Sequence, residues 1–314
     1  MTEVTIVIPA YNEGVELAAN LVTIADHLHG FACSYAFDFV VVDDGSTDES
    51  YDLACRFARF RKNVTVLHFE RNRGLGAALR AGFEHARGEY VVAVDADLSY
   101  RVGVIIELLD AIEAENADIA MASAYMPGGT VANVPWTRKI LSREANRFLS
   151  LATNGRYSTL TCMVRAYRRS FLTRLHSGAD GMEVSPELVF AALRAGGKVI
   201  EVPAALEWSF ERAAGTSRLN WRRLFVHVGG VLRCGLRYRP ALYLAIPGLF
   251  PGLLPLVIAA MLLSHVSAQV FALGTVLTVL IQYTSLAVFA GQAASFFGTA
   301  FFTRRRQAAR YSKP

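Results

Sequence analysis

The most restrictive feature of this sequence is a long segment without charged side chains. Between Ala241 and Phe302 there is no Asp, Glu, Lys or Arg. A helix needs about 20 apolar residues to cross a bilayer. The runs Ala241–Leu263 and Val270–Ala290 are each long enough, and a short polar break separates them. The sequence therefore predicts two transmembrane helices, arranged as a hairpin over residues 241–303.

Basic residues flank this segment on both sides. Arginines mix with aromatic and aliphatic residues over 221–240, which predicts amphipathic helices at the membrane interface. Arg304–Arg306 open a basic tail, 304–314. Since positive flanks remain in the cytoplasm, we expect a multi-pass protein of the cell membrane with its globular domain and both termini cytoplasmic. The net charge of +5 lies largely in these flanks, which favours membrane lipids over nucleic acid as partners.

Two further features concern the oligomeric state of the protein and the redox state of its cysteines. Gly248 and Gly252 are four residues apart in the first apolar run, a small-xxx-small spacing that suits helix packing within a homo-oligomer. The four cysteines are far apart and lack metal-type spacing, so we expect reduced thiols.

Residues 1–220 predict a separate cytosolic domain of the α/β class. Apolar β-rich runs alternate with amphipathic runs, which implies a mainly parallel sheet that binds ligands at the carboxyl ends of its strands. The predicted strands are Val4–Pro9, Phe37–Val42, Val64–Phe69 and Tyr90–Val94, and the predicted helices are Val15–Leu28, Ser50–Phe60 and Ala77–Ala86. We expect Asn12 to cap the first of these helices.

The fourth predicted strand runs directly into two aspartates separated by Ala96. Alternate side chains of a strand point the same way, so Asp95 and Asp97 are expected to present their carboxylates together. Hard anionic oxygens suit Mg²⁺ or Mn²⁺ that also carries a phosphate. A single Asp-x-Asp is equally compatible with a polar turn after a strand.

A glycine pair could be mistaken for a dinucleotide-binding fingerprint. Gly74-Leu75-Gly76 has Leu79 where the third glycine belongs, and it lies in the third strand–helix unit instead of the first. The pair therefore predicts a helix start that packs closely against another segment.

Four motifs together carry a resemblance to a known family. They are Ile6-Val7-Ile8-Pro9-Ala10-Tyr11-Asn12-Glu13, Val41-Val42-Asp43-Asp44-Gly45-Ser46-Thr47-Asp48, Arg71-Asn72-Arg73-Gly74-Leu75-Gly76 and Asp95-Ala96-Asp97-Leu98-Ser99. In this order the chain resembles inverting GT-A glycosyltransferases of family 2, most of all the dolichol-phosphate mannose synthase and polyprenyl-phosphate glycosyltransferase branch. The resemblance covers residues 1 to about 225 and implies a GT-A (nucleotide-diphospho-sugar transferase) fold.

The resemblance also implies a site for the nucleotide sugar. Its residues would be Pro9, Tyr11, Glu13, Val42, Asp44, Asp95, Ala96, Asp97, Arg138, Arg212 and Arg218. Asp44 would hydrogen-bond the base or ribose, although helix capping is the alternative for Asp43, Asp44 and Asp48, and Asp48 is expected to be a cap. Asp97 would bind the metal directly, and Asp95 would assist.

Catalytic roles would belong to Asp95, Asp97, Arg212 and Glu187. Arg212 and Arg218 fit a family pattern in which two cations close on the pyrophosphate. A basic loop attracted to lipid is the alternative for this pair. Glu187 matches an acidic family position near the active site, and by itself it would be a glutamate in the first turn of a helix.

Three positions depart from the family pattern. Ala124 stands where an arginine is usual, Thr159 replaces an aspartate, and Cys162 lies in a segment that usually reads Ser-Gly-aromatic-Arg. These changes remove a phosphate contact and a carboxylate near the acceptor. They leave the sugar and the acceptor open.

We therefore expect metal-dependent, inverting transfer of a hexosyl group, mannose or glucose, from a GDP- or UDP-hexose to polyprenyl or dolichyl phosphate. A phosphate monoester is already ionised at pH 7 and needs no strong base. One alternative is a hydroxyl-bearing glycolipid acceptor with Glu187 as base. The other is a non-catalytic membrane scaffold that binds nucleotide sugars.

Overall fold

The computed structural model describes residues 1–208 and 221–240. The predicted transmembrane hairpin, the basic tail, Arg212 and Arg218 lie outside the described residues. Two compact units are present: Met1–Asn146 with Tyr157–Gly230, and Arg147–Arg156 with Val231–Pro314. Within the described ranges, no helix is both long enough and apolar enough to cross a bilayer.

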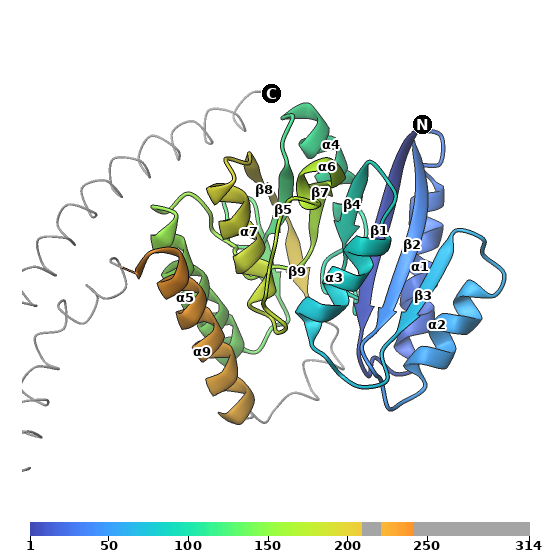
Figure 1. Cartoon of the computed structure of the whole chain (residues 1–314), viewed down its shortest axis with the longest axis horizontal. Helices are drawn as coiled ribbons and strands as arrows, with labels where there is room; N and C mark the ends of the chain where they lie inside the picture. The colour runs from blue at the N-terminus through green and yellow to red at the C-terminus, as the bar shows by residue number, and fades with distance from the viewer. Residues whose placement is uncertain (209–220, 241–314) are drawn as a thin grey trace, which may run out of the picture. The chain divides into compact units, whose positions relative to one another are not determined.

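A seven-stranded sheet forms the centre of the first unit (Figure 1), in the order β3-β2-β1-β4-β7-β5-β8. The strands are β1 (Thr2–Ala10), β2 (Tyr35–Asp43), β3 (Val64–His68), β4 (Tyr90–Ala93), β5 (Ile119–Ser123), β7 (Arg165–Arg168) and β8 (Val199–Pro203). Only β7 runs antiparallel to its neighbours, so the predicted mainly parallel sheet is confirmed. A smaller parallel pair joins β6 (Thr130–Ala132) to β9 (Ala205–Glu207).

Helices follow most of the strands. They are α1 (Glu16–His29), α2 (Ser50–Ala58), α3 (Leu75–His85), α4 (Val104–Ala114), α5 (Trp136–Ala152), α6 (Arg169–Leu172), α7 (Val184–Arg194) and α9 (Trp221–Tyr238). The predicted strands and helices of residues 1–94 are confirmed within a few residues. A helix also occupies the segment predicted to be amphipathic, and its membrane role stays a prediction.

Both faces of the central strands are buried, which explains their continuous apolar runs. Ile6 and Ile8 of β1 belong to one core cluster with Leu21 and Ile24 of α1. Val7 points to the opposite face, where it meets Gly82 of α3 so closely that a Cβ there would overlap the valine side chain. Figure 1 shows α3 and α7 in front of the sheet. The sheet is thus the middle layer of three.

The packing of α1 gives a direct stability prediction. Leu21 is fully buried, whereas its neighbour Val22 is 39% exposed. We expect Leu21→Ala to lower the free energy of unfolding by about 2–5 kcal/mol, because it removes apolar contacts and leaves a cavity. Val22→Ala, the matched control, should change it by less than about 1 kcal/mol. Urea unfolding followed by circular dichroism measures both, and equal effects would contradict this packing.

Candidate active site

Parallel pairing brings four strand ends to one edge of the sheet. Ala10 of β1 is level with Asp43 of β2, and Asp43 is level with His68 of β3. On the other side, β4 pairs with β1 through Val7 and Ala93, and Val94 N donates to Val7 O at 3.0 Å. The loops that carry the four motifs therefore meet at this edge, as ligand sites of parallel sheets do.

The loops after β1 and β2 are joined by side-chain hydrogen bonds. Asn12 does not cap α1, so that prediction is wrong: its Oδ1 accepts from Thr47 N at 2.8 Å, and α1 has no side-chain cap. The N-cap position of α2 is Glu49 and has no side-chain cap, so the prediction that Asp48 is the cap is not confirmed. Asp48 Oδ1 instead accepts from Ser50 N at the start of α2 at 2.9 Å, and its Oδ2 accepts from Gly14 N at 3.0 Å. These contacts hold the predicted nucleotide-binding loop in place.

The three predicted nucleotide-binding residues of the first loop lie at this edge. Pro9 is paired with Val42 across β1 and β2. Tyr11 is 43% exposed, and the backbone N–H of Glu13 donates to Ser50 Oγ at 2.9 Å. Their roles toward a nucleotide stay predictions.

Asp44 ties the loop after β3 to the loop after β2. Its Oδ1 accepts from Arg73 N at 2.7 Å, and its Oδ2 accepts from Gly74 N at 2.8 Å. Burial raises the pKa of Asp44, and the two backbone hydrogen bonds act against that rise. Each oxygen retains a second lone pair, so the predicted bond to a base or ribose is compatible with this structural role.

His68 is a residue of this edge that the sequence analysis missed. Its Nδ1 lies 2.8 Å from Oδ2 of buried Asp43, and its ring lies 4.2 Å from the ring of Tyr51. Within the described part of the chain, Asp43 Oδ1 is buried without a hydrogen-bond partner. A lone histidine at a strand end follows no motif, so only the β2–β3 register could have indicated the pair.

The Asp95–Asp97 segment is a turn and not a strand end. β4 ends at Ala93, Leu98 adopts a positive φ of 52°, and Leu98 N donates to Asp95 O at 3.4 Å. Strand alternation therefore does not orient the two carboxylates, and that part of the prediction is wrong. Asp97 Oδ1 accepts from Ser99 N at 2.8 Å, which fixes the turn from within.

Buried Ala96 secures the middle of this turn, because its carbonyl oxygen accepts from Asn20 Nδ2 of α1 at 2.9 Å. Asp95 and Asp97 are each half-buried. Their oxygens fit the ligand preference of Mg²⁺ or Mn²⁺. Residues 1–208 and 221–240 contain no group of three or more His, Cys, Asp or Glu side chains that could hold a metal.

Cys162 and Tyr100 are buried close to Asp95. Burial raises the pKa of Cys162 to about 12, and the charge of Asp95 adds to the rise. The thiol is therefore neutral, and Cys162 acts as a small apolar side chain next to the turn.

The turn is also connected to β9 and α5. Glu207 N donates to Ser99 O at 2.8 Å, so the end of β9 lies against the turn. Trp208 follows at once, and the guanidinium of Arg138 lies 5.3 Å from its ring centre. Arg138, a predicted nucleotide-sugar residue, thus contacts the residue that follows β9, and the undescribed segment with Arg212 and Arg218 begins one residue later.

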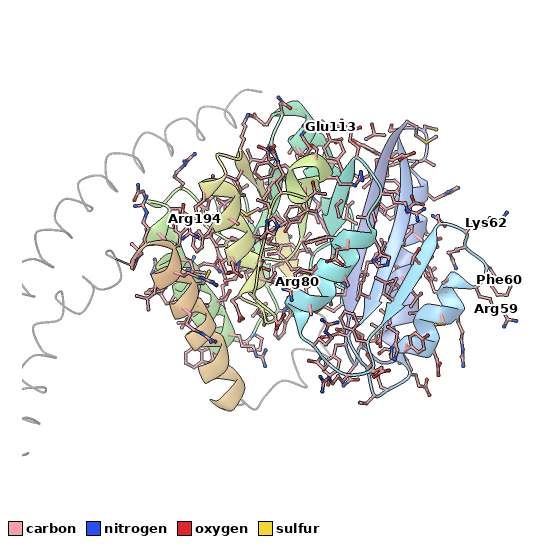
Figure 2. The ribbon with its side chains drawn as sticks, in the orientation of Figure 1. Arg59, Phe60, Lys62, Arg80, Glu113 and Arg194 are labelled. Atoms are coloured by element: carbon pink, nitrogen blue, oxygen red, sulfur yellow. The ribbon has the colours of Figure 1, made fainter. Side chains whose placement is uncertain are left out.

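Glu187 braces a loop that packs on the start of α3. Its Oε2 accepts from Ser177 Oγ at 2.6 Å and from Ala179 N at 3.0 Å. Arg80 of α3 (labelled in Figure 2) reaches the same loop. It pairs there with Asp180. The structure therefore gives Glu187 a positioning role, and its predicted catalytic role stays a prediction.

Gly74 and Gly76 admit this loop to the start of α3. A Cβ on Gly74 would overlap the carbonyl oxygen of Asp180, and one on Gly76 would overlap that of Ala179. Gly76 N donates to Asp180 O at 2.7 Å. The predicted close-packing role of the glycine pair is confirmed.

Thr159, which replaces the family aspartate, belongs to a buried polar cluster. Glu201 Oε1 accepts from Ser158 N at 2.7 Å, Thr159 N at 2.8 Å and Ser123 Oγ at 2.9 Å. Thr159 Oγ1 lies 2.8 Å from Ser123 Oγ and accepts from Tyr125 N. The position therefore supports the loop through a hydroxyl and presents no carboxylate. Ala124, where the family usually has an arginine, is buried next to this cluster.

Comparison with known proteins identifies the family. The model of glycosyl transferase family 2 matches residues 5–175. The chain belongs to glycosyl transferase family 2. Polyprenol monophosphomannose synthase of Mycolicibacterium smegmatis is 36% identical over 241 residues, which cover 74% of this chain and 87% of the relative. Undecaprenyl-phosphate mannosyltransferase of Micrococcus luteus is 31% identical over 239 residues, which cover 74% and 94%.

Solved structures agree on the fold. Glucosyl-3-phosphoglycerate synthase from Mycobacterium tuberculosis, solved with Mn²⁺, UDP and phosphoglyceric acid, matches with a TM-score of 0.57 at 18% identity, over 76% of this chain and 78% of that chain. Mannosyl-3-phosphoglycerate synthase from Rubrobacter xylanophilus matches with a TM-score of 0.55 at 17% identity, over 75% and 73%. The family resemblance and the GT-A fold are therefore confirmed, and this family 2 member is a glycosyltransferase.

The buried carboxylate of Glu201 predicts a pH dependence of stability. Burial raises its pKa above the ordinary value of 4.5, although hydrogen bonds from Thr159, Ser158 and Ser123 oppose the rise. A group with a raised folded-state pKa holds its proton more readily when folded, so its contribution to the free energy of unfolding falls as the pH rises above 4.5.

We expect Glu201→Gln, which cannot ionise, to become more stable relative to the wild type as the pH is raised through this range. The amide accepts weaker hydrogen bonds than a carboxylate at every pH. The informative quantity is therefore how the difference in the free energy of unfolding between the variant and the wild type changes with pH. Urea unfolding at several pH values measures it. A difference that does not vary with pH would contradict the assignment.

Proposed function

We propose that this glycosyltransferase transfers one hexosyl group, mannose or glucose, from a GDP- or UDP-hexose to polyprenyl or dolichyl phosphate. The reaction would invert the configuration at the anomeric carbon and require Mg²⁺ or Mn²⁺. Support for the acceptor comes from two relatives that are named for mannose transfer to polyprenol or undecaprenyl phosphate. The observation that carries the proposal is the edge where the half-buried Asp95–Asp97 turn meets the loops held by Asp44 and Asp48.

The carboxylates of Asp95 and Asp97 are the groups of this edge that would hold the metal. A divalent cation there supplies charge that stabilises the leaving diphosphate. The turn keeps Asp97 in one orientation through Ser99 N. Arg138, Arg212 and Arg218 would add positive charge around the same phosphates. For Arg212 and Arg218 the support is that Glu207, which lies just before segment 209–220 in the sequence, donates to Ser99 O at this turn.

Within the described residues, the two positions considered for a catalytic base favour a phosphate nucleophile. Thr159 stands in place of the family aspartate, and Glu187 is engaged by Ser177 and Ala179. An acceptor phosphate is ionised at pH 7 and can attack the anomeric carbon without a base. A hydroxyl acceptor would need one. The glycolipid alternative is therefore weaker, and the alternative of a scaffold without catalysis has no support from family membership.

We further propose that the enzyme is a multi-pass protein of the cell membrane with its catalytic domain and both termini in the cytoplasm. The charge-free segment between Ala241 and Phe302 and its arginine flanks support this arrangement. Such a tether would keep the catalytic domain at the surface where a polyprenyl phosphate exposes its head group. A homo-oligomer remains compatible with the glycine spacing of the first apolar run.

A transfer assay tests the proposed function. Full-length protein in detergent is offered radiolabelled GDP- and UDP-hexoses, Mg²⁺ or Mn²⁺, and either polyprenyl phosphate or hydroxyl-bearing lipids. We expect transfer of mannose or glucose to the phosphate acceptor. Transfer only to hydroxyl lipids would overturn the acceptor assignment, and donor binding without transfer to any lipid would overturn the enzymatic proposal.

The metal role of Asp97 gives the next prediction. Asp97→Asn keeps an oxygen that can accept from Ser99 N but loses the charge that attracts a cation. We expect kcat/KM to fall by at least about a hundredfold, in line with the loss of one electrostatic stabiliser. Asp26→Asn, an exposed position on α1, is the control and should retain full activity. Activity of Asp97→Asn near the wild-type level would show that this carboxylate holds no metal.

Substitutions of Glu187 distinguish a phosphate acceptor from a hydroxyl acceptor. Glu187→Gln can still accept hydrogen bonds from Ser177 and Ala179, so we expect transfer to polyprenyl phosphate to stay within about tenfold of the wild type, whereas loss of a general base typically costs about 100- to 10,000-fold. Glu187→Leu, which cannot accept these bonds, should lower activity and stability together. A loss in the larger range for Glu187→Gln, with unchanged stability, would assign a base to this position.

A further inference from the structure

The first half of α5 exposes two large apolar side chains to solvent. Trp136 is 73% exposed and Ile140 is 53% exposed. They are four residues apart, so they lie on the same side of the helix, and Arg143 extends this side by one turn and is also exposed. We refer to Trp136, Ile140 and Arg143 as the α5 face. An exposed apolar pair beside a cation is a candidate interaction surface.

The other side of α5 contacts the segment that leads to the candidate active site. Arg138, two residues after Trp136, stacks on Trp208 at 5.3 Å. The preceding residue, Glu207, donates to the carbonyl of Ser99 in the Asp95–Ser99 turn. Two residues of an α-helix span about 200°, so Arg138 and this contact lie on the side of α5 opposite the α5 face.

We propose that the α5 face rests on the lipid bilayer at the level of the head groups. The chemistry of the face fits this partner: tryptophan prefers the membrane–water interface, isoleucine prefers the acyl region, and arginine pairs with anionic head groups. Helix α5 carries four cations (Arg138, Lys139, Arg143 and Arg147) and one acid, Glu144, which suits an anionic surface.

The sequence outside the described residues supplies the reason to choose a bilayer over a protein partner. The same chain contains the charge-free run from Ala241 to Phe302, which the proposed function places in the membrane, and the present inference rests on that proposal. A catalytic domain tethered in this way faces a bilayer permanently. Contact through the α5 face would hold the catalytic domain against the head groups, where the phosphate of a polyprenyl acceptor lies.

Fluorescence quenching tests the contact directly. The chain has three tryptophans, so Trp208→Phe with Trp221→Phe leaves Trp136 alone. The full chain is reconstituted in anionic phospholipid vesicles whose lipids carry a nitroxide near the head group or deep in the acyl chain, without any polyprenyl phosphate. We expect strong quenching of Trp136 by the shallow label. Unquenched Trp136 fluorescence would overturn the proposal.

Phe60 provides a matched control. It is 86% exposed on the turn between α2 and β3 (Figure 2), at the opposite edge of the sheet from β8. A chain in which all three tryptophans are replaced by phenylalanine and Phe60→Trp supplies the only tryptophan should show little quenching. Equal quenching at both positions would mean nonspecific adsorption and would also overturn the proposal.

Kinetics give a second readout. For Trp136→Ser with Ile140→Ser we expect the KM for long-chain polyprenyl phosphate in vesicles to rise about tenfold, which corresponds to about 1.4 kcal/mol, with an unchanged KM for the nucleotide sugar. A short, water-soluble prenyl phosphate should react at the wild-type kcat/KM, and Phe60→Ser should match the wild type throughout. Equal losses with both acceptors would overturn the proposal, because they would show damage to the site itself.

The two proposals fail in different ways. If the wild type transfers no sugar to any prenyl phosphate, the proposed function fails, and the quenching result alone decides whether the α5 face contacts the bilayer. If transfer occurs and Trp136 is not quenched, the proposed function stands and the α5 face does not contact the bilayer.

Discussion

Two hydrogen bonds to one carboxylate fix the form of the candidate site. Asp44 accepts the backbone N–H groups of Arg73 and Gly74 and so holds the loop after β3 against the loop after β2. Gly45, at a φ of +71°, permits this approach, since a Cβ there would overlap the backbone of Arg71. This contact fixes the position of the first residues of α3, and the loop held by Glu187 packs against them.

Most acidic side chains of this edge stabilise the protein's own backbone. Asp44, Asp48, Glu187 and Glu201 each accept at least one backbone N–H, and each joins segments far apart in the sequence or fixes a loop. Charge-assisted bonds of this kind are strong and rigid. A site whose loops are fixed in advance loses little free energy when it orders a substrate. Asp95 and Asp97 are half-buried at the turn and are the pair proposed to hold a cation, and Asp97 also accepts from Ser99 N.

The sequence predicted the elements that depend on local patterns. The buried runs of β1, β2 and β4 and the periodic faces of α1 and α3 leave clear signals, and parallel pairing then places their carboxyl ends together. The close packing at Gly74 and Gly76 was predictable because glycine leaves room for a neighbouring backbone. The four ordered motifs likewise identified the family.

Other features depend on contacts between distant residues and leave no local signal. The pairing of Glu201 with Thr159 spans 42 residues, and the Asp43–His68 pair arises from strand register. The positive φ of Leu98 converts a predicted strand end into a turn, and leucine gives no hint of that conformation. Asparagine is a common helix-capping residue, yet the side-chain oxygen of Asn12 accepts a hydrogen bond from Thr47 N in the neighbouring loop.

The central claim is that this edge binds a metal and a nucleotide diphosphate together. Calorimetric titration of GDP and UDP into the full-length protein, with Mg²⁺ and then with a chelator, tests it most directly. Because a metal held by Asp95 and Asp97 would also bind the diphosphate, we expect tight nucleotide binding with the metal and at least about tenfold weaker binding without it. Replacing Asp95 and Asp97 by Asn should abolish this difference. Equal nucleotide affinity with and without metal in the wild type would contradict the claim.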